Sequence, residues 1–232
     1  LRLSILAAAA DALLPQDCLL CGAQDAAGLL CESCAAELPW LPRLPAALCP
    51  VCAETAPGGA ICGQCIRSPP HFDATFAAFR YAFPIDKLVH ALKYGHRLAI
   101  AGFFAQALRN VPAPDADLIV PLPLSAQRLA ERGFNQSIEI ARPVARTLGL
   151  PLLLDGCTRP IDTTPQAMLP WKARRDNVRH AFECAVDLTG KSVIVVDDVM
   201  TTGSTLDEFA RTLKAHGAAQ ITNLVAARAL RG

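Results

Sequence analysis

Several features that would assign this chain to a simple class are absent or scarce. No apolar run approaches the roughly 18–20 residues of a membrane-spanning helix, and aromatic residues make up only 6% of the chain. The formal net charge of +1 excludes a protein that coats nucleic acid by bulk charge, although a local basic patch is still compatible with it. The composition, with 52% hydrophobic and 19% charged residues, supplies a buried core and gives no sign of disorder. A length of 232 residues suits one large domain or two small ones.

The first segment, residues 1–14, has some features of a signal peptide, with Arg2 ahead of an apolar stretch. Asp11 interrupts that stretch, and Cys18 comes too soon after Pro15 to leave a clear cleavage site. The leucines fall on one helical face, so we predict a short amphipathic helix that packs on the next part of the chain. Without an export signal, a cytoplasmic location is expected; the position of the true N-terminus stays open.

Eight of the ten cysteines form four C-x2-C pairs, and nine residues separate the pairs within each half. The second half repeats the first at a constant offset of 31 residues, which indicates an internal repeat. Each C-x2-C directs two thiolates toward one ion, so two pairs complete a closed tetrahedral zinc site. Two structural Zn²⁺ sites are therefore predicted, with consecutive grouping as the simpler arrangement and crossed grouping left open. The predicted ligands are Cys18, Cys21, Cys31, Cys34, Cys49, Cys52, Cys62 and Cys65.

Other uses of these cysteines fit less well. A disulfide framework requires an oxidising compartment, and catalytic thiol exchange requires a thioredoxin-like βαβ unit that this segment lacks. An iron–sulfur cluster is chemically feasible, but paired knuckles at this spacing favour zinc. The remaining two cysteines, Cys157 and Cys184, are interpreted as small core residues.

Charge argues against direct DNA binding by the ribbons. Residues 1–68 contain three basic and six acidic side chains, and two zinc ions with eight thiolates add further negative charge. A structural or protein-docking role is the simpler interpretation, because this segment has too little core to fold without metal. A boundary is expected at Ser68-Pro69-Pro70. We therefore predict a short helix plus double zinc ribbon over 1–68 and a second domain over 69–232.

The second domain has the pattern of an α/β fold. We expect a strand or hairpin over 72–83, helices over 85–92, 99–108, 135–148 and 205–216, strands over 118–121, 152–154, 192–197 and 221–226, and a loop over 157–181. Short Val/Ile/Leu runs separated by helices indicate a mainly parallel sheet with helices on both faces.

The most informative stretch ends a buried strand in Asp197-Asp198 and continues as a Thr/Gly/Ser loop into a helix. Ligands bind at the carboxyl ends of strands in such sheets, and this loop with the helix N-terminus can cradle a phosphate monoester. The adjacent acids suit the vicinal hydroxyls of a ribose or a bound Mg²⁺. The loop lacks the Gly-Lys-Ser/Thr of a Walker A motif, and no Gly-x-Gly-x-x-Gly occurs in the chain.

This stretch resembles the phosphoribosyl-pyrophosphate (PRPP) motif of type I phosphoribosyltransferases. Further signatures are Val120-Pro121-Leu-Pro123 followed by Arg132-Gly-Phe-Asn-Gln136, Gln166-x2-Leu169-x4-Arg174-x2-Asn177, and Leu92-Lys93-Tyr94-Gly95. Together with the cysteine repeat they resemble the competence protein F (ComF/GntX) family over nearly the whole chain. The resemblance implies a type I phosphoribosyltransferase-like fold behind a double zinc ribbon, PRPP binding with Mg²⁺, and a link to DNA uptake in competent bacteria.

The resemblance also implies roles for particular residues. Asp197 and Asp198 would hold the ribose hydroxyls, and residues 201–205 the 5′-phosphate. The turn after the first core strand would contact pyrophosphate, and the segment 157–181 would act as a lid with the cations Lys172, Arg174, Arg175 and Arg179. Asp197, Asp198, Arg132 and Arg174 are the expected catalytic residues. The full expected PRPP-binding set is Asp197, Asp198, Thr201, Thr202, Gly203, Ser204, Thr205, Pro123, Leu124, Arg132, Asn135, Gln136, Lys93, Arg174 and Asn177.

Three functions stay open at this point. The chain is a phosphoribosyltransferase with an unknown acceptor, a non-catalytic PRPP sensor or docking module, or a handler of single-stranded DNA. Only residues 206–232 come after the phosphate loop, so no segment for recognising a base can be assigned there. Residues 69–232 carry the excess of positive charge, and Trp171 is available for base stacking. Expected partners are PRPP and either single-stranded DNA or the DNA-uptake or replication-restart machinery.

Overall fold

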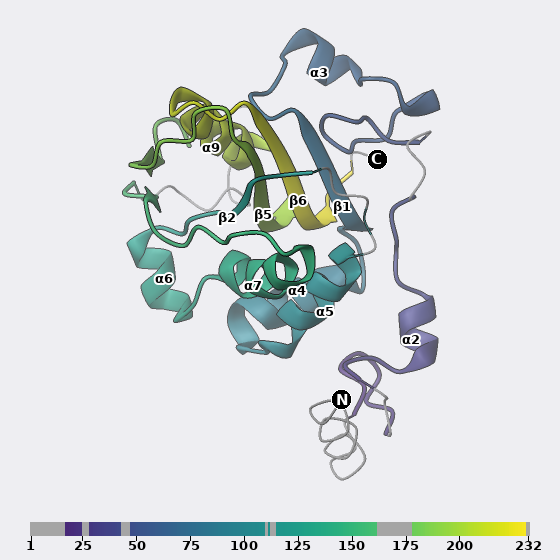
Figure 1. Ribbon diagram of the computed structural model, residues 1–232. Coiled ribbons are helices and arrows are strands. Elements are labelled where there is room, and N and C mark those ends of the chain that lie inside the picture. Colours follow the sequence, from purple (N-terminus) through teal and green to yellow (C-terminus); the bar gives the residue numbers. More distant parts are fainter. Residues whose placement is uncertain are drawn as a thin grey trace.

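A parallel sheet of four strands in the order β1-β6-β5-β2 forms the centre of the computed structural model (Figure 1). The structure describes residues 17–24, 28–42, 47–109, 111, 115–161 and 178–230. Strands β5 and β6 lie in the middle and are buried almost throughout, as expected for strands covered on both faces. The strands are β1 (Ala74–Arg80), β2 (Leu118–Pro121), β5 (Ser192–Met200) and β6 (Gln220–Arg228).

Helices cover both faces of the sheet. Alternate residues of β5 point to opposite sides: Ile194 and Val196 enter one hydrophobic core, and Val193 and Val195 enter the other. The first core is packed by α4 (Ile85–Gly95), α5 (Ala99–Arg109) and α7 (Gln136–Leu148), and the second by α9 (Ser204–Ala215). Figure 1 shows α4, α5 and α7 together on one side of the sheet. The predicted α/β class with helices on both faces is confirmed.

The cysteine segment repeats in its backbone as well as in its sequence. The Cys18 amide donates to the carbonyl of Ala23, and the Cys49 amide donates to that of Glu54, each five residues ahead. Gly22 and Ala53, also 31 positions apart, both have positive φ. A five-residue helix comes next in each half, α2 (Glu32–Ala36) and α3 (Gly63–Arg67), and a short 3-10 turn, η2 (Pro57–Gly59), lies between the second pair of knuckles.

The link between the two cysteine clusters lies along the outer edge of the sheet. The Leu41 amide donates to the carbonyl of Ala78 at 2.9 Å, and the Arg80 amide donates to that of Pro39 at 2.8 Å. These bonds pair the link with β1 and protect an edge that would otherwise present unpaired backbone groups. The link thus separates the two clusters, and α2 and α3 lie well apart in Figure 1.

Most predicted elements are present with small shifts of their bounds. The segment 72–83 contains the single strand β1 rather than a hairpin, because the link between the cysteine clusters occupies the edge position. The segment 152–154 contributes one isolated parallel bridge, between Ile119 and Leu152. Beyond the cysteine segment, the sequence did not indicate the helix α6 (Ala126–Arg132) or the short pair of β3 (Cys157–Thr158) with β4 (Glu183–Cys184). The helix predicted over 1–14 lies outside the described residues.

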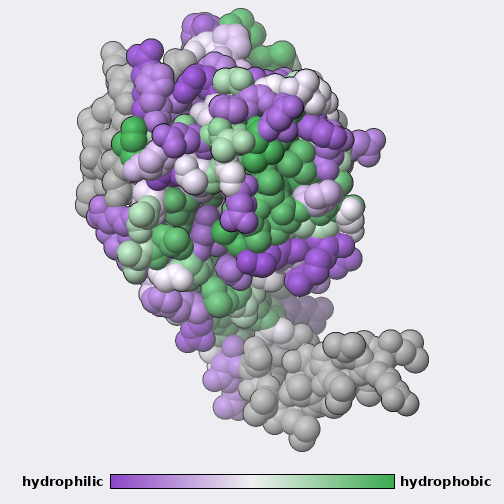
Figure 2. Space-filling view, turned by 60° about the vertical axis from the view of Figure 1, so that its left-hand side comes forward, coloured by the Kyte–Doolittle hydropathy of each residue, from purple (hydrophilic) through white to green (hydrophobic). Residues whose placement is uncertain are grey.

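The two isolated cysteines are neighbours in space. Cys157 and Cys184 are direct partners in the β3–β4 pair, with their Sγ atoms 3.5 Å apart. Cys184 is buried and Cys157 half-buried, so their interpretation as small packing residues holds. Among the described residues, no helix combines the length and apolar character needed to cross a membrane. On the face shown in Figure 2, a hydrophobic area near the middle is bordered by hydrophilic residues.

Candidate functional site

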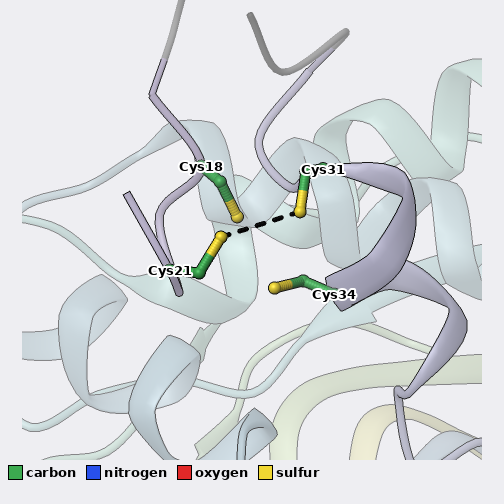
Figure 3. Close-up of side chains that lie close together, drawn as sticks. All are labelled: Cys18, Cys21, Cys31 and Cys34. Carbon is green, nitrogen blue, oxygen red and sulfur yellow. Dashed lines mark hydrogen bonds between the residues drawn. The ribbon is translucent and has the colours of Figure 1, made fainter. Parts of the chain in front are cut away.

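Two clusters of four thiols are formed by consecutive pairs of knuckles. Within each cluster the four Sγ atoms lie within 4.8 Å of one another. In the first cluster, Cys18 and Cys21 face Cys31 and Cys34 at the start of α2, and the Sγ atoms of Cys21 and Cys31 are 3.7 Å apart (Figure 3). Four converging thiols are the donor set of a structural zinc site, so the residues fit the metal. Of the two groupings left open by the sequence, the structure has the consecutive one.

The thiols of each cluster differ in acidity. Burial raises the pKa of the Cys18 thiol, but hydrogen bonds from the backbone amides of Cys31 and Cys21 outweigh burial and lower it to about 6. In the second cluster the same competition lowers the pKa of Cys62 to about 7, chiefly through the Cys65 amide. Hydrogen bonds with neighbouring thiols raise the pKa of Cys34 to about 12. Each cluster thus has at least one thiol predisposed to ionise, which is the form that binds a metal.

The second cluster is more deeply embedded than the first. Cys49, Cys52 and Cys65 are buried and belong to the hydrophobic core packed by α9, whereas Cys21 is exposed. The Cys62 amide donates to the Cys49 sulfur at 3.3 Å, and the Sγ atoms of Cys52 and Cys62 are 3.5 Å apart. The second metal site is therefore part of the core of the sheet domain, and the first is peripheral.

A polar network surrounds the two carboxylates at the end of β5. The Lys93 ammonium, from α4, lies 2.6 Å from Oδ2 of Asp198, and Gln136, from the start of α7, donates to Oδ1 of Asp198 at 3.3 Å. Ser137 donates to Oδ1 of Asp197 at 2.9 Å. Both carboxylates are buried, with 7% and 2% of Asp197 and Asp198 exposed. The helices α4 and α7 thereby bring polar groups from distant parts of the chain onto one pair of acids.

The two carboxyl groups respond oppositely to this environment. Burial and the adjacent charge of Asp198 raise the pKa of Asp197 to about 7. Burial alone would raise the pKa of Asp198 as well, but the charge of Lys93 and its hydrogen bond outweigh burial and lower it. Near neutral pH the pair therefore holds one firm negative charge, on Asp198, and a second group poised to gain or lose a proton.

Arg132, one of the predicted site residues, extends this network through Gln136. Arg132, the last residue of α6, donates from Nη1 to Oε1 of Gln136 at 3.0 Å and lies 5.4 Å from the ring centroid of Tyr94. A continuous polar path thus runs from Arg132 through Gln136 and Asp198 to Lys93. Residues predicted from three separate motifs are brought together here.

The loop after β5 has the geometry of an anion cradle. Gly203 has φ +84°, a backbone conformation that favours glycine, and a Cβ there would lie 2.6 Å from Cε at the flexible end of the Met200 side chain. Gly203 also caps α9 without a side chain, which exposes the first turn of the helix to a ligand. The Thr202 hydroxyl accepts a hydrogen bond from the Ser204 amide at 3.2 Å and lies 2.9 Å from the Ser204 hydroxyl. Thr201 and Thr205 flank this turn and are half-buried.

Asn135 holds the turn after β2 that is predicted to contact pyrophosphate. The side-chain nitrogen Nδ2 of Asn135 donates to the carbonyl of Leu122 at 3.0 Å, and the side-chain oxygen Oδ1 accepts from the backbone amide of Ser137 at 2.8 Å. Asn135 thus caps α7 and holds the turn that contains Pro123 and Leu124. Both of these side-chain hydrogen bonds of Asn135 are made to backbone groups.

The predicted lid falls largely outside the described residues, and with it Lys172, Arg174, Arg175, Asn177 and Trp171. Arg179 is described. It lines a cavity of about 410 Å³ with His180, Ser204 and Glu208, beside the first turns of α9.

Two residues of the site were not expected from the sequence. Ser137 comes directly after the Arg-Gly-Phe-Asn-Gln motif, and the position of Asn135 as a helix cap was the available signal for it. Arg228 has only 3% of its surface exposed and contacts the carbonyls of Met200 and Thr201, which begin the loop. No sequence pattern indicated it, because its partners lie far away along the chain.

Comparison with known proteins agrees with these two parts. The double zinc ribbon domain model matches residues 9–66, and the phosphoribosyl transferase domain model matches residues 135–231. The chain thus combines a double zinc ribbon with a phosphoribosyltransferase domain.

Relatives of known name place the chain in a family. It is 34% identical over 201 residues to DNA utilization protein YhgH of Salmonella typhi, covering 83% of this chain and 87% of the relative. It is 31% identical to competence protein F of Haemophilus influenzae, covering 69% of this chain and 75% of the relative. The chain belongs to the competence protein F family, which includes these proteins. A glutamine PRPP amidotransferase from B. subtilis superposes with a TM-score of 0.37 and 23% identity, over 53% of this chain and 25% of the amidotransferase.

Proposed function

We propose that this chain binds PRPP with Mg²⁺ at the carboxyl end of β5 and uses it in DNA utilisation or uptake. One observation carries the proposal. The paired carboxylates of Asp197 and Asp198 lie within a polar network, directly ahead of a glycine-dependent phosphate loop that begins α9. A ribose phosphate has vicinal hydroxyls at one end and a phosphate at the other, and this site offers acceptors and an anion cradle in that order.

Each group has a separate part in binding. Asp197 and Asp198 accept hydrogen bonds from the ribose hydroxyls, and residues 201–205 bind the 5′-phosphate through amides and hydroxyls. The cations Lys93 and Arg132, with Gln136 between them, are placed for the pyrophosphate. Pro123 and Leu124 contribute the adjacent turn, and Arg174 and Asn177 would reach the ligand from the predicted lid. Mg²⁺ would neutralise pyrophosphate charge, and the carboxylates are suitable ligands for it directly or through water.

If the chain transfers the phosphoribosyl group, its own residues act mainly by electrostatics. A nucleophile forms a bond to the anomeric carbon while the bond from that carbon to the pyrophosphate oxygen breaks, and the electron pair leaves with pyrophosphate. Lys93 and Arg132 stabilise the departing charge, and the carboxylates favour positive charge developing on the ribose ring. Release of pyrophosphate that depends on an added acceptor would distinguish transfer from sensing.

The proposal is tested by thermal unfolding of the zinc-loaded chain with Mg²⁺ and either PRPP, ribose 5-phosphate or pyrophosphate. A ligand that binds only the folded state, at about a hundredfold excess over its Kd, adds about 2.7 kcal/mol. We expect PRPP to raise Tm by ~5 °C or more and the two fragments to raise it less. A Tm that no ligand changes would contradict the proposal.

Direct handling of single-stranded DNA is a second candidate, because the relatives are named for DNA utilisation and competence. The excess of basic residues after residue 68 could contact phosphates, while the ribbons are acidic. A labelled single strand should then bind with an affinity that falls steeply with salt. Salt-independent binding, or none, would exclude this candidate.

Because the zinc clusters need reduced thiols, we place the protein in the cytoplasm.

A further inference from the structure

Arg228 is a buried charge at the junction between the second zinc ribbon and the phosphate loop. It is the last residue of β6, in register with Met200 of β5, and 3% of its surface is exposed. A guanidinium buried to this extent requires several acceptors. Apart from the adjacent Ala229, its acceptors come from two separate parts of the chain.

One set of acceptors belongs to the phosphate loop. Nη1 of Arg228 donates to the carbonyl of Met200 at 3.2 Å and to the carbonyls of Thr201 and Ala229. The Ala229 amide in turn donates to the carbonyl of Met200 at 3.0 Å. The guanidinium therefore fixes the backbone at the point where β5 ends and residues 201–205 begin.

The other set belongs to the second metal cluster. Nε of Arg228 donates to the carbonyl of Cys52 at 2.8 Å, and Nη2 lies 3.5 Å from a carboxylate oxygen of Glu54. Cys52 is one of the four thiols of the cluster, and the Glu54 carbonyl accepts the amide of Cys49, another of them. A zinc ion with four thiolates carries a net charge of −2, which favours a buried cation beside it.

Apolar packing joins the same two parts. Cys49, Cys52 and Cys65 share one hydrophobic core with Phe72, Met200 and Leu206. Phe72 lies 3.8 Å from the place where a Cβ of Gly203 would be. The first ribbon makes different contacts: Leu19, Leu20, Leu29 and Leu30 pack against the opposite core, and α2 lies well away from α3 in Figure 1.

We propose that Arg228 is a positioning residue that couples the second zinc ribbon to the phosphate loop. Filling of the second site fixes the Cys52 carbonyl and Glu54. These hold the guanidinium, which holds Met200 and Thr201 in the conformation that receives a phosphate. Because binding free energies are reciprocal, a phosphate ligand in the loop then raises the zinc affinity of the second site but not that of the first. The part of this proposal that concerns ligand affinity rests on the proposed PRPP site.

The test uses the full zinc-loaded chain and compares Arg228→Lys with Arg80→Lys. Arg80 is the register partner of Arg228 at the end of β1, but it is exposed. Lysine keeps the charge at 228 but cannot reach all the acceptors of the guanidinium fork. Amide hydrogen exchange over residues 200–206 is expected to be about tenfold faster in Arg228→Lys and unchanged in Arg80→Lys, with two zinc ions retained in both.

A second comparison removes one metal site at a time. Loss of the second site, by Cys62→Ser with Cys65→Ser, should accelerate exchange over 200–206 and weaken PRPP·Mg²⁺ binding about tenfold. Loss of the first site, by Cys31→Ser with Cys34→Ser, should change both within twofold. Glu54→Gln keeps all eight cysteines, so it tests the same contact even if the double cysteine variants unfold. Its effect on exchange over 200–206 should lie between those of the two double variants.

The outcomes separate the two proposals. Equal effects of the two metal sites, or exchange over 200–206 that responds to neither Arg228→Lys nor Glu54→Gln, would overturn the coupling. Failure of the wild-type chain to bind PRPP would overturn the proposed ligand. The exchange measurements would still test the contact between ribbon and loop.

Discussion

Two adjacent carboxyl groups at the end of β5 have opposite electrostatic surroundings. Asp198 is paired with Lys93, while Asp197 accepts a hydrogen bond from Ser137 and is buried beside another acid, with no cation of the described residues at ion-pair distance from it. A structural ion pair would need only one of them. The second acid costs stability, and such a cost is typical of groups retained for binding or catalysis.

Replacement of Asp197 by asparagine should therefore stabilise the protein at high pH. Burial raises the pKa of Asp197 to about 7, so the carboxyl ionises in the unfolded chain from about pH 4 but in the folded chain only near pH 7. The wild-type chain loses stability across that interval and Asp197→Asn does not. Chemical denaturation should show the variant gaining ~2–4 kcal/mol relative to wild type between about pH 4 and pH 8.

The control for this prediction is Asp187→Asn. Hydrogen bonds from Thr189 lower the pKa of Asp187, so its contribution to stability is present at high pH and declines as pH falls. This control should show no gain with rising pH. A difference between Asp197→Asn and wild type that stays constant with pH would contradict the assignment.

Gly203 should be required for ligand affinity and not only for stability. In Gly203→Ala, positive φ costs about 1 kcal/mol and the added Cβ displaces Met200. We expect PRPP·Mg²⁺ affinity, measured by titration, to fall at least about tenfold. Gly149→Ala is the matched control, because Gly149 has φ +66° in open space at the end of α7. Similar losses of affinity in both variants would argue against a specific role for the loop.

Among the helices, α4 places the Lys93 ammonium beside Asp198, although α4 comes long before β5 in the chain. Lys93 is in the last turn of α4, whose apolar face, Ile85, Leu88, Val89 and Leu92, is buried against the sheet. The sequence alone does not decide whether Lys93 reaches the site or ends a helix. In the structure Lys93 lies in the last turn of α4, and its ammonium contacts the Asp198 carboxylate.

Lys93→Met should leave the carboxylate of Asp198 buried without its cation. We expect a loss of about 2–3 kcal/mol in the free energy of unfolding at about pH 8, where Asp198 is charged. The loss should be smaller at about pH 5, because without the cation the raised pKa lets Asp198 take up a proton. Lys87→Met, on the exposed face of α4 and 3.9 Å from Asp86, should change stability by less than about 0.5 kcal/mol. Equal losses in the two variants would contradict the ion pair.

How far the sequence predicts these elements depends on how local their causes are. The strand over 118–121 and the helices over 99–108 and 205–216 arise from local apolar patterns, and they are confirmed almost to the residue. Of the strand or hairpin expected over 72–83, the structure has the single strand β1, because residues 39–41 of the link between the cysteine clusters take the place of a second hairpin strand. The β3–β4 pair joins residues separated by 25 positions or more, and no local pattern records such a pairing.

The same distinction applies to the candidate site. The carboxylates, the loop and the metal ligands are recognisable because their spacing in the chain reflects their chemistry. Arg228 and Ser137 contact partners that are distant in sequence; the motif before Ser137 offered a weak signal for that residue, whereas only the folded chain identifies Arg228. The roles assigned to the PRPP-binding residues stay predictions until a ligand is measured.

At the scale of the whole molecule, the two metal sites differ in how far they support the fold. Three cysteines of the second cluster are buried in the core packed by α9, whereas Cys18 alone is buried in the first. Removal of the second metal should therefore disturb the sheet domain, and removal of the first should not.

Metal analysis should find two zinc ions per chain. Cys52→Ser should lose one of them and lower Tm by ~5 °C or more, because it leaves thiols unpaired in the core. Cys21→Ser, at the exposed position of the first cluster, should also lose one zinc but lower Tm by less than ~2 °C. Equal decreases would mean that both ribbons are integral to the same core.

We propose that Asp197, Asp198 and the loop 201–205 form a PRPP site. Calorimetric titration of the zinc-loaded chain with PRPP and Mg²⁺, beside the double variant Asp197→Asn with Asp198→Asn, tests it most directly. We expect one PRPP per wild-type chain and no detectable binding to a double variant that remains folded and retains two zinc ions. Absence of binding by the folded wild-type chain, or equal binding by the double variant, would contradict it.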